Sequence, residues 1–320
     1  MKITEKKIIV CCSTAISGGP ELLHQLVHEL RSIGRDAYIA YYPFEKSFDC
    51  PEPYKKYNAP QSPLFDDADT FVIIPEVSTW IIKRIKKAKV GVWWLSVDNY
   101  LHAKHQSKLR DLYSRYKSLL RWRVPLSRMR HLVHFSQSQY ATDFLTAANI
   151  TSIPLTDYLG EDHLINLDSK APAIKENIVA YNPKKGQKQT KELMAANTDI
   201  KYIPIENMSS KQVAELLARA KIYIDFGHHP GKDRPPREAA MAGCCVITGL
   251  SGSAANSKDV AIPKIYKLND KTSEYITDFR NLAEDIFSNY ASHAREYEEY
   301  RNKIAQEPVI FKNQVKDIFN

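Results

Sequence analysis

The first half of the chain alternates short apolar runs with segments whose apolar residues recur at helical spacing. We predict buried strands where about four to eight apolar or β-branched residues stand together, and helices where one face is apolar. The predicted strands are Lys7–Cys12, Ala37–Tyr42, Thr70–Ile74, Val90–Val97, Leu132–Ser136 and Thr151–Leu155. The predicted helices between them are Glu21–Ile33, Trp80–Ala88 and Ser138–Ala148. Strands that are separated by helices form parallel sheets, so this half is predicted to be an α/β domain.

The second half repeats this alternation. The predicted strands are Asn177–Tyr181, Tyr202–Ile205, Ile222–Phe226, Cys244–Thr248 and Pro263–Leu268. The predicted helices are Thr190–Ala196, Lys211–Arg219 with Ser209 or Ser210 as its cap, a short helix from Pro235 to Gly243, and Ser273–Asn320 with a break near Pro308. Prolines suit the first turn of a helix and glycine suits its left-handed end, so the short helix has signals at both ends. We therefore predict a second α/β domain.

The segment between the two halves has the composition of a linker. Tyr158–Pro172 mixes Gly, Asp, Ser and Pro without a regular apolar pattern. The predicted organisation is an N-terminal Rossmann-like domain over 1–157, a linker over 158–172, a second Rossmann-like domain over 173–272 and C-terminal helices over 273–320.

Charge and cysteine content narrow the class of protein. The formal net charge of +8 favours anionic partners, which are phosphate groups, nucleic acid or an acidic membrane surface. No apolar run approaches the roughly 20 residues of a membrane-spanning helix, and the run at the start is too short for a signal peptide. The cysteines are Cys11, Cys12, Cys50, Cys244 and Cys245, a spacing that suits neither a disulfide framework nor a zinc site. We expect a cytoplasmic protein with reduced thiols and no metal.

The strongest chemical signal lies between two predicted strands, at 227–243. Lys232, Arg234 and Arg237 gather positive charge around Gly231 and the start of the short helix. A helix N-terminus adds free N–H groups and partial positive charge, so this turn is predicted to hold a diphosphate. Glu238 is placed to accept hydrogen bonds from a ribose diol, as the acidic residue of dinucleotide-binding folds does. The alternative interpretation is a surface turn with solvated charges and a helix-capping glutamate.

The run Arg-Glu-Ala-Ala-Met-Ala-Gly at 237–243, before a Val-Ile strand, resembles the nucleotide-binding signature of the GT-B glycosyltransferases. The resemblance implies two Rossmann-like domains with parallel sheets that face a central cleft, with final helices that cross back to the first domain. In that family the glutamate at the place of Glu238 holds the ribose of the donor. Many retaining members carry another glutamate earlier in the loop, where this chain has Pro230 beside His229, so the retaining mechanism does not transfer simply.

Three further loops resemble elements of the same family. Lys184 or Lys185, in a Lys-Lys-Gly turn after the first strand of the second domain, is implied to neutralise the leaving diphosphate. The nucleobase is implied to lie against backbone near Ile205–Met208. Gly18 and Gly19, in a Gly-Gly-Pro-Glu sequence, resemble the first loop of these enzymes and are implied to lie near donor or acceptor.

Carboxylates at the C-terminal ends of predicted parallel strands are candidates for catalysis, because ligands of open α/β sheets bind at that edge. Glu76 follows the third predicted strand and Asp98 the fourth, and either can take the proton of an acceptor hydroxyl. We favour Asp98, because the neighbouring Trp93, Trp94 and Tyr100 are predicted to form aromatic walls. The alternative for each is a carboxylate that caps a helix. His229 is a further candidate for catalysis, and lesser candidates are His102, His105, Glu161, Asp162 and His163, with Asn99 and Glu161 expected in loops near the donor or acceptor.

A basic segment follows this group. Residues 104–131 carry one acid among many lysines and arginines, with leucines and tyrosines at helical spacing. One hypothesis is that this helix makes peripheral contact with an anionic membrane. The alternative is that its apolar face packs on the first domain.

The function that these observations predict is glycosyl transfer from a nucleotide sugar, such as a UDP- or GDP-hexose, to a saccharide or lipid-linked saccharide. We expect this in bacterial-type cell-surface polysaccharide synthesis, in the cytoplasm or at the inner face of the plasma membrane, without a cofactor. One alternative is a nucleotide-sugar epimerase of the same architecture. Another is a non-catalytic subunit that binds carbohydrate or protein, since fold does not fix function. Only net charge favours nucleic acid, which we do not expect as a partner.

Overall fold

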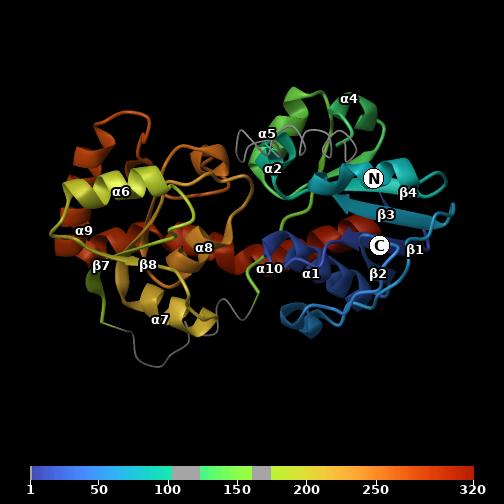
Figure 1. Cartoon of the computed structure of the whole chain (residues 1–320), viewed down its shortest axis with the longest axis horizontal. Helices are drawn as coiled ribbons and strands as arrows, with labels where there is room; N and C mark the ends of the chain where they lie inside the picture. Colours follow the sequence, from blue (N-terminus) through green and yellow to red (C-terminus); the bar gives the residue numbers. More distant parts are fainter. Residues whose placement is uncertain (1, 103–122, 161–173) are drawn as a thin grey trace. The chain divides into compact units, whose positions relative to one another are not determined.

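The computed structural model describes residues 2–102, 123–160 and 174–320 (Figure 1). The chain divides into two compact units. Unit 1 comprises residues 1–157 together with 309–320, and unit 2 comprises residues 158–308. Each has its own sheet and its own hydrophobic core.

Unit 1 is built on a six-stranded sheet with strand order β2-β1-β3-β4-β5-β6, in which all paired strands run parallel. The strands are β1 (Lys7–Cys12), β2 (Asp36–Tyr41), β3 (Thr70–Pro75), β4 (Lys89–Trp94), β5 (Val133–Ser136) and β6 (Ile153–Pro154). The helices are α1 (Gly18–Ser32), η1 (Glu52–Tyr57), η2 (Glu76–Arg84), α2 (Val97–His102), α4 (Leu126–Met129) and α5 (Gln139–Ala147). The loops that follow the parallel strands therefore gather at one edge of the sheet.

Unit 2 is built on a four-stranded parallel sheet with strand order β10-β9-β7-β8. The strands are β7 (Glu176–Tyr181), β8 (Lys201–Pro204), β9 (Ala220–Asp225) and β10 (Cys245–Thr248). The helices are α6 (Gln187–Ala196), α7 (Ser210–Arg219), α8 (Arg234–Met241), η5 (Gly252–Ala255), η6 (Lys264–Tyr266), α9 (Tyr275–Glu296) and the part of α10 (Glu298–Phe319) up to Pro308, since the rest of α10 belongs to unit 1. Because β9 and β7 are adjacent, the loops after them share one edge of the sheet, and the predicted diphosphate turn is one of these loops.

Three of the predicted elements are wrong. Pro263–Leu268 is not a strand but contains the 3-10 turn η6, because the N–H of Tyr266 donates to Pro263 O over 3.1 Å within the turn, and in the described part of this segment only Lys267 forms a bridge to the sheet. The C-terminal helices break at Tyr297 rather than at Pro308, which lies inside α10. The segment predicted as helix Trp80–Ala88 is the 3-10 element η2, which starts at Glu76. Every other predicted strand overlaps an observed one.

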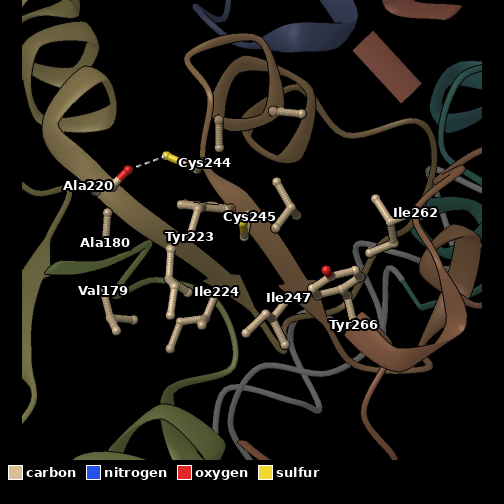
Figure 2. Close-up of a cluster of buried hydrophobic side chains, with 14 of the residues drawn as sticks. Val179, Ala180, Ala220, Tyr223, Ile224, Cys244, Cys245, Ile247, Ile262 and Tyr266 are labelled. Carbon is tan, nitrogen blue, oxygen red and sulfur yellow. Dashed lines mark hydrogen bonds between the residues drawn. The ribbon is translucent and has the colours of Figure 1, made fainter. Parts of the chain in front are cut away.

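The core of unit 2 packs side chains of its sheet, among them Val179 of β7, Tyr223 of β9 and Ile247 of β10 (Figure 2). Cys244 lies at the edge of this cluster and donates its S–H to Ala220 O over 3.3 Å. The cysteines at 11, 12, 244 and 245 are buried and free, and burial raises the pKa of each thiol. These thiols are therefore packing groups, as their place in predicted strands indicated.

One half-buried lysine of unit 2, Lys175, was not anticipated. Lys175 Nζ donates to the carbonyl oxygens of Leu217 at 3.0 Å, Ala220 at 2.9 Å and Ala242 at 2.8 Å. Two of these carbonyls lie at the ends of α7 and α8, where the helix dipole favours a cation. Gly243 lies beside this ammonium group in the left-handed conformation, with a φ of 84°. A Cβ at this position would lie 3.4 Å from Lys175 Nζ. The ammonium group thus ties two helices to the start of β9.

Candidate functional site

In unit 2 the loop after β7 is pressed against the loop after β9. Gly186 has a φ of 54°, and a Cβ on it would lie 2.7 Å from the carbonyl carbon of Phe226. A Cβ on Gly227 would lie 2.5 Å from Cβ of Lys185. Only glycine permits this approach at both positions. The approach brings Lys185, predicted to meet a phosphate, to the turn that precedes α8.

The turn between β9 and α8 is fixed by hydrogen bonds from the next loop. Ser253 of η5, which is fully buried, donates its N–H to His229 O over 2.9 Å and its hydroxyl to Gly231 O. At the other end, Gly227 N donates to Asp225 Oδ1 over 3.0 Å. Sequence reasoning did not find Ser253, because the contact joins two loops that are remote in sequence. The turn is therefore held in one shape.

His229 lies inside this turn, between two carboxylates. Its Nε2 is 3.4 Å from Asp225 Oδ1 and its Nδ1 is 3.2 Å from Asp233 Oδ2. Burial alone would lower the pKa of His229, but the two carboxylates outweigh burial and raise the pKa to about 9. The ring is therefore an imidazolium at neutral pH. Its side chain is 0% exposed, so we assign it to holding the turn rather than to the catalytic role predicted from sequence.

The charge on His229 predicts a pH dependence of stability. Its folded pKa of about 9 lies above the ordinary histidine pKa of 6.5, so its contribution to stability is fully present below pH 6.5 and is lost as pH rises through 9. The difference corresponds to about 3 kcal/mol. The free energy of unfolding of wild type should therefore exceed that of His229→Asn, and the difference should shrink by about this amount from about pH 6 to about pH 10. Urea unfolding followed by far-UV circular dichroism measures both values. Parallel pH profiles of the two proteins would contradict the charged imidazole.

Asp233 occupies the N-cap position of α8 but does not cap the helix. The next residues are Arg234, Pro235 and Pro236, and a proline has no N–H to donate. The carboxylate instead forms ion pairs with Lys185 Nζ and His229 Nδ1, both through Oδ2. The start of α8 thus offers fewer backbone donors to an anion than the sequence argument assumed.

Two of the basic residues predicted to bind the donor are bound to Glu307 of α10. Lys232 Nζ is 2.7 Å from Glu307 Oε1, and Arg237 Nη1 is 2.7 Å from Glu307 Oε2. Arg237 is 1% exposed and also donates to Lys232 O over 3.1 Å and to Asp233 O over 3.3 Å. These contacts give Lys232 and Arg237 a structural role in joining the turn and α8 to α10.

The other predicted donor residues occupy the same edge in different settings. Glu238 and Arg234 are half-buried on α8, and Gly231 is buried in the turn before it. Lys184 is exposed, with its N–H donating to Asn182 Oδ1 over 3.0 Å. Met208 is half-buried after β8 and packs against the core of unit 2. The sheet topology therefore collects the loops that carry these residues at one edge.

At the corresponding edge of unit 1, Glu76 lies directly after β3. It is 1% exposed, and its Oε2 accepts the N–H of Leu95 over 2.9 Å. Burial raises the pKa of Glu76 to about 7, although hydrogen bonds from the backbone and the charge of Arg123 act in the opposite direction. Gly19 lies next to the loop that carries Leu95, because a Cβ on Gly19 would be 3.9 Å from Leu95 Cδ1.

The sequence favoured Asp98 over Glu76 as the base, with Trp93 and Trp94 as the walls of its site. Asp98 lies in the first turn of α2, is 2% exposed, and accepts the hydroxyl of Tyr140 over 2.7 Å. The tryptophans predicted as aromatic walls are core residues: both are fully buried, and Trp93 donates to Leu155 O while Trp94 donates to His134 Nδ1. That part of the prediction is wrong, because residues of a central strand face the core.

The remaining predicted residues of unit 1 and of the linker are placed as follows. Gly18 and Gly19 begin α1, and Asn99 is exposed on α2. Glu161, Asp162, His163 and His105 lie outside the described residues, as does most of the basic segment 104–131. In the described part of the chain, no group of three or more His, Cys, Asp or Glu side chains is arranged to hold a metal ion. Across the same residues, no helix combines the length and apolar character needed to span a membrane.

Known protein structures share this arrangement although their sequences do not. No family model matches the sequence, and no curated protein matches it. The chain is similar to the sucrose-phosphate synthase of Thermosynechococcus elongatus, with a TM-score of 0.60 and 11% identity over 98% of this chain and 95% of that one. It is also similar to the lipopolysaccharide outer core galactosyltransferase WaaB, with a TM-score of 0.60 and 13% identity over 97% and 98%.

A third similar structure is an alpha-glucosyltransferase in complex with UDP, with a TM-score of 0.54 and 12% identity over 97% of this chain and 99% of that one. At such identities the likeness establishes the fold alone. Two α/β units with parallel sheets, matched over nearly the whole length of each of these proteins, show that the chain has the GT-B fold.

Proposed function

We propose that this protein is a glycosyltransferase that moves a sugar from a nucleoside diphosphate donor to an acceptor hydroxyl. The observation that carries the proposal is the construction of the edge of unit 2. Gly186 and Gly227 bring Lys185 against the turn before α8, and Glu238 lies farther along that helix. A cation for the diphosphate thus lies on the loop after β7 and a carboxylate for the ribose on α8, at one edge of the sheet in a chain with the GT-B fold.

The side chains divide into groups that meet the donor and groups that hold them in place. Lys185 and Arg234 stabilise the charge that develops on the leaving diphosphate, in the way that fixed cations stabilise transition states. Glu238 accepts hydrogen bonds from the ribose. His229 and Arg237 hold the shape of the turn. Preorganised groups of this kind need no rearrangement during the reaction.

Glu76 is the proposed general base. A base is most effective when its pKa lies near the working pH, and the pKa of Glu76 is raised to about 7. The side chain follows β3 at the edge where ligands of open α/β sheets bind. The acceptor hydroxyl would meet Glu76 in the bound complex, since catalytic hydrogen bonds often tighten only with substrate present.

The acceptor is proposed to be a saccharide or a lipid-linked saccharide of a surface polysaccharide. One similar structure is named as a lipopolysaccharide galactosyltransferase, which supports this class, and another holds UDP, which supports a uridine donor. No metal ion is part of the proposal, and the basic segment 104–131 remains the proposed site of peripheral membrane contact.

Nucleoside diphosphates are expected to raise the melting temperature of the protein, and Glu238→Ala is expected to weaken that effect. Loss of the carboxylate leaves ribose hydroxyls without a partner, which costs about 1–3 kcal/mol of binding free energy. The measurement is a thermal-shift titration with UDP, GDP and ADP and with their sugar conjugates.

The matched control is Glu215→Ala, which removes an exposed glutamate of α7. An equal response of wild type and Glu238→Ala to every nucleotide would overturn the role of Glu238. Release of nucleoside diphosphate that requires an added acceptor separates glycosyl transfer from interconversion of the free sugar nucleotide.

A further inference from the structure

One carboxylate at the proposed donor site is built into place without serving its helix. Asp233 is the N-cap residue of α8, yet the prolines at 235 and 236 remove the N–H groups that such a side chain normally accepts. Its own side chain makes no cap hydrogen bond. Helix capping therefore does not account for an acid at this position.

The ion pairs of Asp233 involve only one of its two oxygens. Lys185 Nζ and His229 Nδ1 both contact Oδ2, and the side chain is 18% exposed. A carboxylate offers about four lone-pair sites, two on each oxygen. Within the described residues, Oδ1 makes none of the ion pairs or hydrogen bonds found for this side chain. The two cations thus orient the group and leave Oδ1 as an acceptor.

The charge of Asp233 also restricts what can approach it. A carboxylate repels a phosphate, so it does not suit direct contact with the diphosphate. It suits a hydroxyl, which donates a strong hydrogen bond to an ionised acceptor. Within the donor, hydroxyls belong to the ribose and to the transferred sugar, and Glu238 is the proposed partner of the ribose about one and a half helical turns further on.

We propose that Asp233 is a specificity-determining residue that accepts a hydrogen bond from a hydroxyl of the transferred sugar at Oδ1, while Lys185 and His229 hold Oδ2. The inference rests on the proposed function, since it assigns the sugar end of the same site. It makes the turn before α8 a sugar-reading element as well as a phosphate-binding one. Lys185 then has two tasks, which are to orient Asp233 and to face the diphosphate.

Asp233→Ala is expected to weaken binding of the sugar nucleotide without weakening binding of the diphosphate alone. Affinity for UDP-glucose or GDP-mannose should fall relative to the matching diphosphate by about tenfold or more, as expected for a lost hydrogen bond to a charged group. Affinity for UDP or GDP alone should stay the same or rise, because a negative charge is removed and Lys185 is released. Isothermal titration calorimetry with these four nucleotides measures both effects.

Deoxy-sugar analogues of the donor identify the hydroxyl. Removal of one hydroxyl should reproduce the loss in wild type and should cost nothing further in Asp233→Ala, which is the coupling of a double-mutant cycle. Asp233→Asn keeps the shape of the side chain and provides a second variant if alanine impairs folding. Asp199→Asn, which changes an exposed aspartate paired with Arg280, is the control.

Equal weakening of diphosphate and sugar nucleotide in both Asp233 variants would overturn the inference and leave Asp233 as a positioning group for Lys185. Additive effects of every deoxy analogue and Asp233→Ala would overturn it as well. Absence of binding of any nucleotide to wild type would instead overturn the proposed function itself.

Discussion

Glu76→Gln is expected to lower kcat by about 10²–10⁴-fold, the usual contribution of a general base. The glutamine keeps an oxygen that can accept the N–H of Leu95, so the loop after β4 keeps its anchor. It cannot accept a proton at the pH where the reaction runs. In wild type, the activity should fall on the acid side of about pH 7, where the carboxyl of Glu76 is protonated.

Steady-state kinetics across this pH range test both parts of the prediction. The variant should lose the acid limb of the profile as well as the rate, which a purely structural change would not cause. Glu45→Gln is the control, because Glu45 is an exposed glutamate of unit 1 paired with Arg84. An unaltered kcat in Glu76→Gln would show that Glu76 is not the general base, and Asp98 would become the candidate again.

Most strand positions were readable from sequence because most of the strands, such as β1, β3 and β10, are buried on both faces. The run Lys7–Cys12 is apolar from its second residue and matches β1 at both ends. Pro263–Leu268 also contains apolar residues, but the N–H groups of Tyr266 and Lys267 donate to Pro263 O and Lys264 O within a 3-10 turn, which a count of apolar residues does not register. Local composition therefore predicts where a strand can form, but the partners of the backbone N–H groups decide whether it forms.

The sequence indicated which loops share an edge of the sheet, but not which groups their charged side chains meet. Lys185 and Glu238 stand in runs whose spacing around strands is visible in sequence, and the topology brings their loops to one edge. The partners of Lys232 and Arg237 were not predictable, since both pair with Glu307, 70 residues away from Arg237. A positive charge near a helix start does not show whether it faces a ligand or an acid of the same chain.

Glu307→Ala is expected to destabilise unit 2 by about 3–5 kcal/mol, the usual cost of removing one partner from a buried ion pair. The change takes the carboxylate away from two side chains that are 1% and 12% exposed, Arg237 and Lys232. All four tryptophans precede residue 123 and so belong to unit 1, which means that tryptophan fluorescence does not report this loss. Urea unfolding should instead be followed by far-UV circular dichroism and by hydrogen exchange in α8.

This destabilisation arises because a buried charge loses its partner. It does not require that the ion pair itself makes a large net contribution to the free energy of unfolding. The double variant Glu307→Leu with Arg237→Met should therefore regain much of the lost stability, because apolar side chains of similar volume often replace a buried pair without loss. Glu299→Ala, on the exposed face of the same helix, should change stability by less than about 1 kcal/mol. If the double variant proved less stable than Glu307→Ala, Glu307 would contribute through direct packing instead. In either case nucleotide affinity should fall with Glu307→Ala, because the turn that carries Lys232 and Asp233 loses its attachment to α10.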